Sequence, residues 1–350
     1  MNETNAENAT QSILTDDEDY DEDYPDYTNY YIPLGVVAVI IVVVNSFIVI
    51  LVAKNAKLRT SCNALLVSLA IADGTTGLIG IPVLMVGNLH ENLPIETMCC
   101  LALAIHTWFW FMSVCSILHL LVIACEQYLA ILRPFSHDKI VNKTSVTSAI
   151  AFIWTISIAH SLVPWTWILQ LGSQFCTVED ETVQRNDENF IIASIVLFFF
   201  LPLGMISYVY FCLVLEAKCQ MRRIKRECSI LKVEGSETPP PSSCTRFRGF
   251  YVLALMSFVF IGCWTPYFVV VFHVTIRNKE LPFWLDYKFM VLRFLPPVLN
   301  PLMFAFWKKD FRAACVRMFH CRSNPSEQRG VPAMQQLLNR LSISSKNQSL

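Results

Sequence analysis

Long apolar stretches separated by short polar segments run through most of the chain. A helix needs about 20 predominantly apolar residues to cross the hydrocarbon core of a bilayer. Seven stretches have this character, at residues 32–53, 63–86, 99–132, 145–171, 190–215, 249–276 and 285–306. The pattern therefore predicts an all-α membrane protein in which residues 32–306 form a bundle of seven transmembrane helices.

Polar segments flank this bundle. Residues 1–31 form an acidic N-terminal tail, and residues 307–350 are predicted to hold a short amphipathic eighth helix and a C-terminal tail. A helix with one apolar face and basic residues elsewhere typically lies flat among lipid headgroups. The apolar face consists of Phe311, Ala314, Cys315, Met318 and Phe319, and the basic residues are Lys308, Lys309, Arg312 and Arg317.

Composition supports a membrane protein and excludes other classes. Hydrophobic residues make up 54% of the 350 residues and charged residues 16%, whereas a globular protein has about 25% charged residues. No nucleophile, base and orienting group converge in the sequence, and no phosphate-binding loop or Cys/His metal pattern occurs. We therefore expect no enzyme, no nucleic-acid partner and, because repeated halves are absent, no transporter.

The positions of Lys and Arg predict the orientation, because basic loops resist transfer across the membrane. If the N-terminus lies outside, 22 of the 27 Lys and Arg fall on the inner side and 19 of the 28 acidic residues on the outer side. We therefore expect a multi-pass plasma-membrane protein with an extracellular N-terminus and a cytoplasmic C-terminus. The first residues are polar and acidic, so the first span itself is expected to drive insertion.

The N-terminal tail carries two kinds of modification signal. Asn2 and Asn8 begin Asn-x-Ser/Thr acceptor patterns for glycosylation, although single matches also arise by chance. Residues 16–31 combine eight carboxylates with five tyrosines, a composition too polar to pack into a core. This segment is either a solvated tail or an acidic arm that captures a basic ligand, with tyrosines available for sulfation.

Cysteine usage follows the same topology. Of the 13 cysteines, Cys99, Cys100 and Cys176 lie near the oxidising outer face. One disulfide is expected, between Cys176 and either Cys100 or Cys99, which would pin the second outer loop to the third helix. Cys315 and Cys321 on the inner side are candidate palmitoylation sites, or alternatively free buried thiols.

Ionisable residues within apolar spans are functional candidates, because an unsatisfied charge in the bilayer is costly. Asp73 lies in the middle of the second span, Glu126 closes the third, and Arg293 lies in the seventh. Prolines in the later spans remove backbone hydrogen bonds and introduce kinks. A helix bundle with polar groups in its interior and several proline kinks is suited to conformational change.

Short motifs occur in order through all seven spans. They are Asn45, Leu69-Ala70-x-Ala72-Asp73, Ser116 with Glu126-Gln127-Tyr128, Trp154, Pro202 with Tyr210, Cys263-Trp264-Thr265-Pro266, and Asn300-Pro301-Leu302-Met303-Phe304. With these motifs, residues 32–320 resemble the rhodopsin-like (class A) G-protein-coupled receptors. The resemblance implies a receptor that transmits an extracellular ligand signal to a cytoplasmic heterotrimeric G protein, with arrestin as a further partner.

The resemblance also implies an allosteric sodium ion and an activation switch. The sodium ion would be held by Asp73, Ser116 and Asn300, although a protonated or hydrogen-bonded Asp73 is the alternative. The switch would centre on Trp264, just before the Pro266 kink, and would include the packing triad of Ile117, Pro202 and Phe260. A bulky core side chain is the alternative interpretation of Trp264, but the Cys-Trp-x-Pro context favours the switch.

Two residues depart from the family pattern on the signalling side. Gln127 replaces the arginine that would form a charged pair with Glu126 and reach the G protein. Phe304 replaces a tyrosine, and so lacks the hydroxyl that would join Tyr210 through water. An atypical receptor that binds or scavenges its ligand and recruits arrestin without G protein is therefore the alternative function.

The candidate ligand pocket is mostly aromatic. It comprises His106, Phe109, Trp110 and Ser113 from the third span, Trp264, Tyr267 and Phe268 from the sixth, and Arg293 from the seventh. Phe109 occupies the position of the aspartate of amine receptors, and the seventh span has no lysine that could bind retinal. A peptide or lipid-like ligand is therefore expected. Arg293 is either a counter-ion for its carboxylate or phosphate, or a side chain that snorkels to the interface or pairs with a loop acid.

Overall fold

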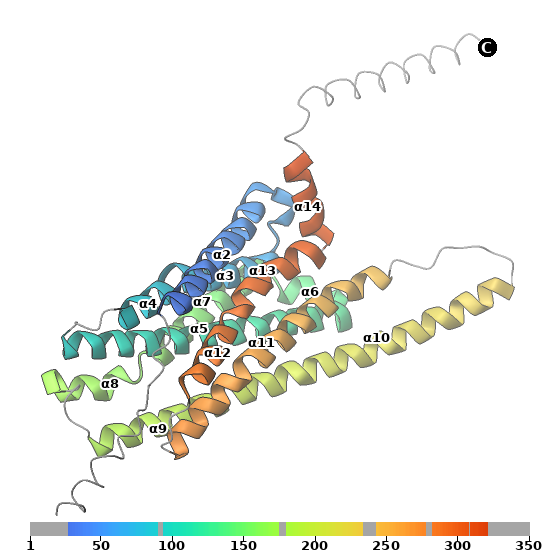
Figure 1. Ribbon diagram of the computed structural model, residues 1–350. Helices are drawn as coiled ribbons and strands as arrows, with labels where there is room; N and C mark the ends of the chain where they lie inside the picture. Colours follow the sequence, from blue (N-terminus) through green and yellow to red (C-terminus); the bar gives the residue numbers. More distant parts are fainter. Residues whose placement is uncertain are drawn as a thin grey trace, which may run out of the picture.

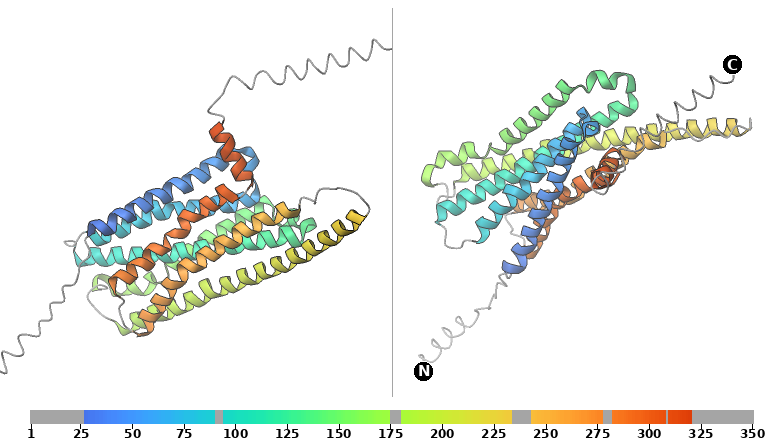
Figure 2. Two further views of the ribbon diagram at one scale, coloured as in Figure 1. Left: turned by 45° about the vertical axis from the view of Figure 1, so that its right-hand side comes forward. Right: turned by 90° about the horizontal axis from the view of Figure 1, so that it is seen from above.

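The structure of the protein is a computed structural model. It describes residues 27–89, 94–174, 180–233, 243–277, 282–307 and 309–320. Within these ranges the chain forms helices and short connections, with no β-strand. The long helices lie side by side in one elongated bundle (Figures 1 and 2). The predicted all-α fold is confirmed.

The first four predicted spans correspond to continuous or nearly continuous helices. Their bounds are α2 (Tyr27–Lys54); α3 (Ser61–Thr75), which continues through a π-helical turn, η2 (Thr76–Gly80), into α4 (Ile81–Leu89); α5 (Ile95–Leu132); and α7 (Lys143–Ser161). Shorter elements connect them or follow them, namely η1 (Ala56–Leu58), α6 (Pro134–Ile140), α8 (Trp165–Ile168) and η3 (Leu169–Gln174).

The last three predicted spans correspond to helices that extend beyond the predicted bounds or consist of two segments. Their bounds are α9 (Glu181–Ile195), which continues through the π-helical turn η4 (Val196–Phe200) into α10 (Leu201–Val233); α11 (Ser243–Arg277); and α12 (Phe283–Arg293) followed by α13 (Leu295–Trp307). Six helices, counted within the described residues, are long and apolar enough to cross a membrane. The seventh predicted span is present as the α12–α13 pair.

Local chemistry explains where these helices differ from the predicted spans. The fifth span starts nine residues earlier than expected, because the Asp180 side chain accepts hydrogen bonds from the Thr182 and Val183 backbone N–H groups and caps α9. The seventh is interrupted at Phe294, just before Pro296 and Pro297. Proline has no N–H to continue the hydrogen-bond ladder, so a helix breaks here rather than running through.

The bundle has two distinct ends. α8 and the start of α2 lie at one end, which we call the α8 end; α6 and α14 (Lys309–His320) lie at the other, which we call the α14 end (Figure 1). α14 is the predicted amphipathic helix, and it packs against α13 and α2. Its residues Phe311 and Ala314 are buried, whereas Arg312 and Arg317 are exposed.

Apolar side chains divide between an interior core and the outer surface of the bundle. The main core cluster runs along its length and includes Leu51, Leu69, Ile117, Phe260 and Met303. Other large apolar side chains face outward and are exposed, among them Val39, Leu78, Phe200 and Phe258. In water such a surface would be unfavourable, but lipid tails cover it without cost.

Candidate functional site

An aromatic cluster lies between α5, α7, α9 and α11. Trp110 is buried, and its ring lies 5.6 Å from the ring of His160, 5.5 Å from Phe190 and 5.9 Å from Phe268. Its indole N–H donates a hydrogen bond to His106 Nε2 over 2.9 Å. Since this nitrogen accepts, it carries no proton in this arrangement. The predicted pocket residues His106, Trp110 and Phe268 are thus brought together.

Arg293, the last residue of α12, points into the bundle. Its side chain is buried, and its guanidinium carbon lies 4.0 Å from the ring centroids of both Phe109 and Tyr267. Each contact is a cation–π interaction between helices, with Phe109 on α5 and Tyr267 on α11. A side chain that snorkels to the interface would be exposed, so the buried position contradicts that alternative.

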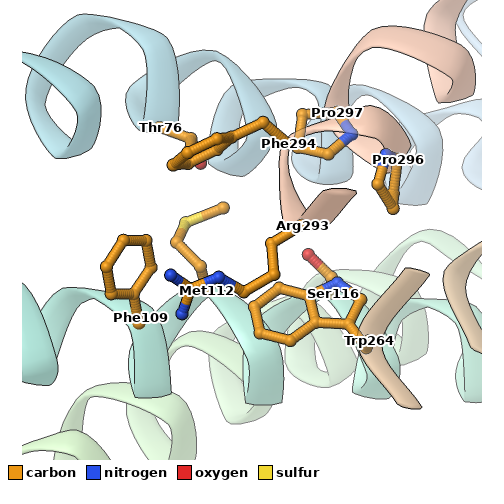
Figure 3. Close-up of a pocket in the computed structure, with 9 residues that line it drawn as sticks. All are labelled: Thr76, Phe109, Met112, Ser116, Trp264, Arg293, Phe294, Pro296 and Pro297. Carbon is orange, nitrogen blue, oxygen red and sulfur yellow. The ribbon is translucent and has the colours of Figure 1, made fainter. Parts of the chain in front are cut away.

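The Arg293 guanidinium faces a small cavity inside the bundle (Figure 3). The cavity is lined by Thr76, Phe109, Met112, Ser116, Trp264, Arg293, Phe294, Pro296 and Pro297. None of these nine residues carries a carboxylate. The cavity is therefore an apolar and aromatic space with one cation in its wall, and Ser113, also predicted for the pocket, is buried nearby on α5.

Trp264 joins this cavity to the core below it. Its ring stacks on Phe260 with centroids 5.7 Å apart and on Phe268 with centroids 5.8 Å apart. Phe260 and Ile117 belong with Trp264 to the same buried cluster, and Pro202 is buried in α10. The structure thus places the predicted switch tryptophan between the cavity and its packing partners.

A second group of polar residues lies next to the cavity between α2, α3 and α13. Asn300 Nδ2 donates to Asp73 Oδ2 over 2.8 Å, and Asn45 Nδ2 donates to the Pro297 carbonyl over 2.9 Å. The Ser116 hydroxyl also interacts with the Asp73 carboxyl group. The three predicted sodium-site residues are therefore together.

Several buried oxygens in this group have no hydrogen-bond partner. They are Asp73 Oδ1, Asn45 Oδ1, Asn300 Oδ1 and the hydroxyl oxygen of Thr76. Buried polar atoms normally have a partner, and carboxylate and carbonyl oxygens are the ligands that hard cations prefer. The donor set therefore fits a sodium ion, whose charge would offset the buried Asp73 carboxylate.

At the α14 end, the carboxyl group of Glu126 makes several polar contacts. Gln127 Nε2 donates to Glu126 Oε2 over 2.7 Å, and the Cys62 thiol donates to the same oxygen over 3.2 Å. His137 Nε2, on α6, lies 3.0 Å from Glu126 Oε1. Gln127 thus provides a neutral donor to Glu126 where the family has a charged one, and His137 provides a group that can carry a positive charge.

His137 was not among the residues predicted from the sequence. Its Nδ1 lies 3.0 Å from Asp138 Oδ1, so two carboxylates flank the ring. Burial lowers the pKa of His137, but hydrogen bonds and charges from Asp138 and Glu126 outweigh this effect and raise the pKa above its ordinary value of 6.5. Only the adjacent pair His137-Asp138, in the polar segment between the third and fourth spans, could have signalled this contact.

Two further polar contacts join helices. Tyr210 on α10 and Ser257 on α11 have hydroxyl oxygens 3.2 Å apart, so Tyr210 has a partner that the sequence did not indicate. Trp154 Nε1 donates to the Ser68 hydroxyl oxygen over 3.0 Å, and Ser68 lies 2.9 Å from His119 Nε2. The backbone of Phe304 lies in α13, and its side chain is outside the described residues.

The cysteines correct one prediction. Cys99 is disulfide-bonded, whereas Cys100, the residue favoured from the sequence, has a free and exposed thiol. Consecutive residues of a helix point about 100° apart, so only one of the two can face a given partner. Cys315 is a free, partly buried thiol. Cys176, Cys321 and the acceptor residues Asn2 and Asn8 lie outside the described residues.

Comparison with known proteins decides the family. A sequence model of the 7 transmembrane receptor (rhodopsin family) matches residues 44–304, a range that contains the cavity, the Asp73 group and the Glu126 cluster. The chain belongs to this family. It is therefore a multi-pass membrane receptor of the plasma membrane and not an enzyme, and the resemblance seen in the motifs is confirmed.

Relatives of this rhodopsin-family receptor are distant. The 5-hydroxytryptamine receptor 2C of Rattus norvegicus is 25% identical over 350 residues, which cover 87% of this chain and 75% of the relative. The histamine H2 receptor of Cavia porcellus is 26% identical over 314 residues, which cover 85% of this chain and 82% of the relative. Both relatives support the assignment of this chain to the family.

Proposed function

We propose that this receptor binds an extracellular peptide or lipid-like ligand at Arg293, with only an anionic group of the ligand entering the small cavity there, and signals to a heterotrimeric G protein at the α14 end. In this orientation the N-terminal tail is extracellular and the C-terminus cytoplasmic, as the distribution of Lys and Arg favours. One observation carries the proposal. Arg293 and Trp264 line the same cavity, so a ligand held by the cation would press on the ring that stacks against Phe260.

The cavity favours an anionic ligand group over an ammonium group. The relatives above are named for 5-hydroxytryptamine and histamine, both amines. In this chain an ammonium group would meet the buried Arg293 guanidinium, whose carbon lies 4.0 Å from the rings of both Phe109 and Tyr267. Like charges at this depth repel strongly, because a low-dielectric interior screens them poorly. A carboxylate or phosphate would instead gain a charge-assisted hydrogen bond.

Arrestin recruitment without G protein is the second candidate function. Gln127 favours it, because its amide is engaged with Glu126 and offers a partner protein no charge. We also propose three further features of this receptor. They are a sodium ion at Asp73, glycosylation of Asn2 and Asn8, and palmitoylation of Cys315 and Cys321. Each remains a proposal with its own chemical support.

The experiment compares full-length receptor variants in cells, with recruitment of G protein and arrestin as separate readouts. The probes are peptides with a free C-terminal carboxylate or the matched amide, fatty acids or the matched alcohols, and 5-hydroxytryptamine and histamine. We expect responses only to acids. The Arg293→Gln substitution should lower the potency of an active acid at least about tenfold, because truncating a buried charged partner costs about 2–5 kcal/mol.

The control is Lys288→Gln, which removes an exposed cation from the same helix. It should leave potency unchanged, and surface expression of both variants is measured with an N-terminal tag. A response of the wild-type receptor to 5-hydroxytryptamine or histamine would overturn the proposed ligand class. G-protein recruitment by the active acid supports the first function, and arrestin recruitment alone supports the second.

A further inference from the structure

The ring of His137 lies between two carboxylates at the α14 end. Its Nε2 is 3.0 Å from Glu126 Oε1 on α5, and its Nδ1 is 3.0 Å from Asp138 Oδ1 on α6. Carboxylate oxygens only accept hydrogen bonds when ionised, and a neutral imidazole has a single N–H. With both carboxylates ionised, both contacts can be hydrogen bonds only when the ring carries two protons, so this geometry favours the imidazolium form.

Glu126 is the more buried partner. It is 6% exposed, whereas the His137 side chain is 22% exposed and within reach of solvent protons. The other contacts of Glu126 come from Gln127 on its own helix and from Cys62 on α3, and neither is a cation. His137 is thus the group in this cluster that can neutralise a nearly buried carboxylate.

We infer that the Glu126–His137 pair is a proton-binding site that makes signalling depend on the pH at the α14 end of the bundle. The inference rests on the proposed function, in which this end faces the cytoplasm and meets the transducer protein. With the proton bound, the pair ties α6 to the end of α5. When the proton leaves, the single N–H of the ring can donate to only one of the two carboxylates, so the link between α6 and the end of α5 beside Gln127 weakens.

The direction of the effect follows from the flanking charges. The charged groups that face His137 are Glu126 from α5 and Asp138 from α6, and their attraction outweighs burial and raises the His137 pKa above 6.5. The tied arrangement is therefore complete at low pH and is lost as pH rises through this raised pKa. Histidine titrates in the physiological range, so a cytoplasmic change of a fraction of a pH unit shifts the population.

The first test measures the proton site itself. Hydrogen–deuterium exchange of the imidazole C2 proton, followed by mass spectrometry, reports the pKa of each histidine in the full-length receptor in nanodiscs. We expect the His137 pKa to lie above 6.5 in the wild type, and to fall in both Asp138→Asn and Glu126→Gln. An unshifted His137 pKa, or one that neither variant lowers, would overturn the inference. Because Asp138 is exposed, its variant remains informative if Glu126→Gln fails to fold.

The second test measures signalling. Basal recruitment of G protein and arrestin is recorded with the cytosol clamped between about pH 6 and about pH 8. Because partly exposed ion pairs contribute little, recruitment should rise only about two- to fivefold with pH in the wild type. In His137→Gln it should be independent of pH and equal to the high-pH level. The exposed His273→Gln variant should behave as the wild type.

The two tests separate failure of the inference from failure of the proposed function. If no transducer is recruited at any pH, the proposed function fails while the histidine measurement still decides on the proton site. If the wild type and His137→Gln show the same dependence on cytosolic pH, the pair does not control signalling and the inference is wrong. A fall in recruitment with rising pH also overturns it.

Discussion

Asn300 donates a hydrogen bond from Nδ2 to Oδ2 of Asp73 over 2.8 Å, which ties α13 to the middle of α3. The second oxygen of the same carboxyl group has no hydrogen-bond partner, although Asp73 is fully buried. A lone buried carboxylate is costly unless something offsets its charge. In the proposed sodium site, this second oxygen would bind the ion beside the cavity that Trp264 lines.

We predict that Asp73→Asn abolishes stabilisation of the receptor by sodium. Asparagine keeps the size of the side chain but removes the charge that would attract the ion. A bound ion stabilises the native state by mass action, so the wild-type melting temperature should rise when sodium replaces choline in the buffer. The variant should show no such rise. An equal sodium effect in both proteins would place the ion elsewhere, and Asp310→Asn, an exposed carboxylate on α14, is the matched control.

We predict that Gln127→Arg increases recruitment of G protein relative to arrestin. An arginine at this position would replace a neutral donor by a charged one beside Glu126, and in the proposed orientation it would lie near the surface that meets the transducer. The measurement compares basal and ligand-stimulated recruitment of both transducers at equal surface expression. If the wild type recruits G protein as well as the variant does, the arrestin-only alternative is excluded.

We predict that Cys99→Ser destabilises the receptor and Cys100→Ser does not. Cys99 is disulfide-bonded, and loss of a native disulfide typically costs about 2–5 kcal/mol. Cys100 is free and exposed, so its thiol stabilises nothing in the described structure. Thermal unfolding and cell-surface expression check both variants. Equal loss in the two would show that either cysteine can form the bond.

The fold followed from the sequence because seven apolar stretches leave few alternatives in a bilayer. Helix ends were less predictable. α9 begins in a polar segment that no apolar pattern indicates, and its start depends on the Asp180 cap. The seventh span reads as one apolar stretch, but Pro296 and Pro297 divide it at Phe294. Hydropathy averages over a window, whereas a cap or a break depends on single hydrogen bonds.

The site was partly predictable for a similar reason. Asp73 and Arg293 stand out because charges are rare in apolar spans, and the structure places both beside the cavity or its polar neighbour. His137 does not stand out, because a histidine in a polar loop is ordinary. Its contact with Glu126 exists because α6 folds back against α5, and the sequence pattern carries no information about that approach.

We predict that Ser68→Ala destabilises the receptor by about 1–3 kcal/mol, the cost of leaving buried polar groups unsatisfied. An indole N–H can only donate, so the Ser68 oxygen accepts from Trp154 and its hydroxyl can donate to His119 Nε2. The alanine variant removes both contacts, which join α3 to α7 and α5. Ser148→Ala, at an exposed position of α7, is the control. Unchanged thermal unfolding of Ser68→Ala would show that the network contributes no net stability.

We predict that alanine has opposite effects at two helical glycines. A Cβ atom at Gly80 would fall on the indole ring of Trp108, 2.6 Å from Cδ1 and closer to Nε1, whereas a Cβ at Gly204 meets no atom within 4 Å. Gly80 thus lets the end of η2 approach α5 at a distance that no side chain permits. Overpacking typically costs about 1–3 kcal/mol, while an unhindered Gly→Ala change in a helix gains up to about 1 kcal/mol. Gly80→Ala should therefore lower the melting temperature and Gly204→Ala should keep or raise it. A neutral Gly80→Ala would mean that Trp108 can move aside and that the close approach of these helices is not required.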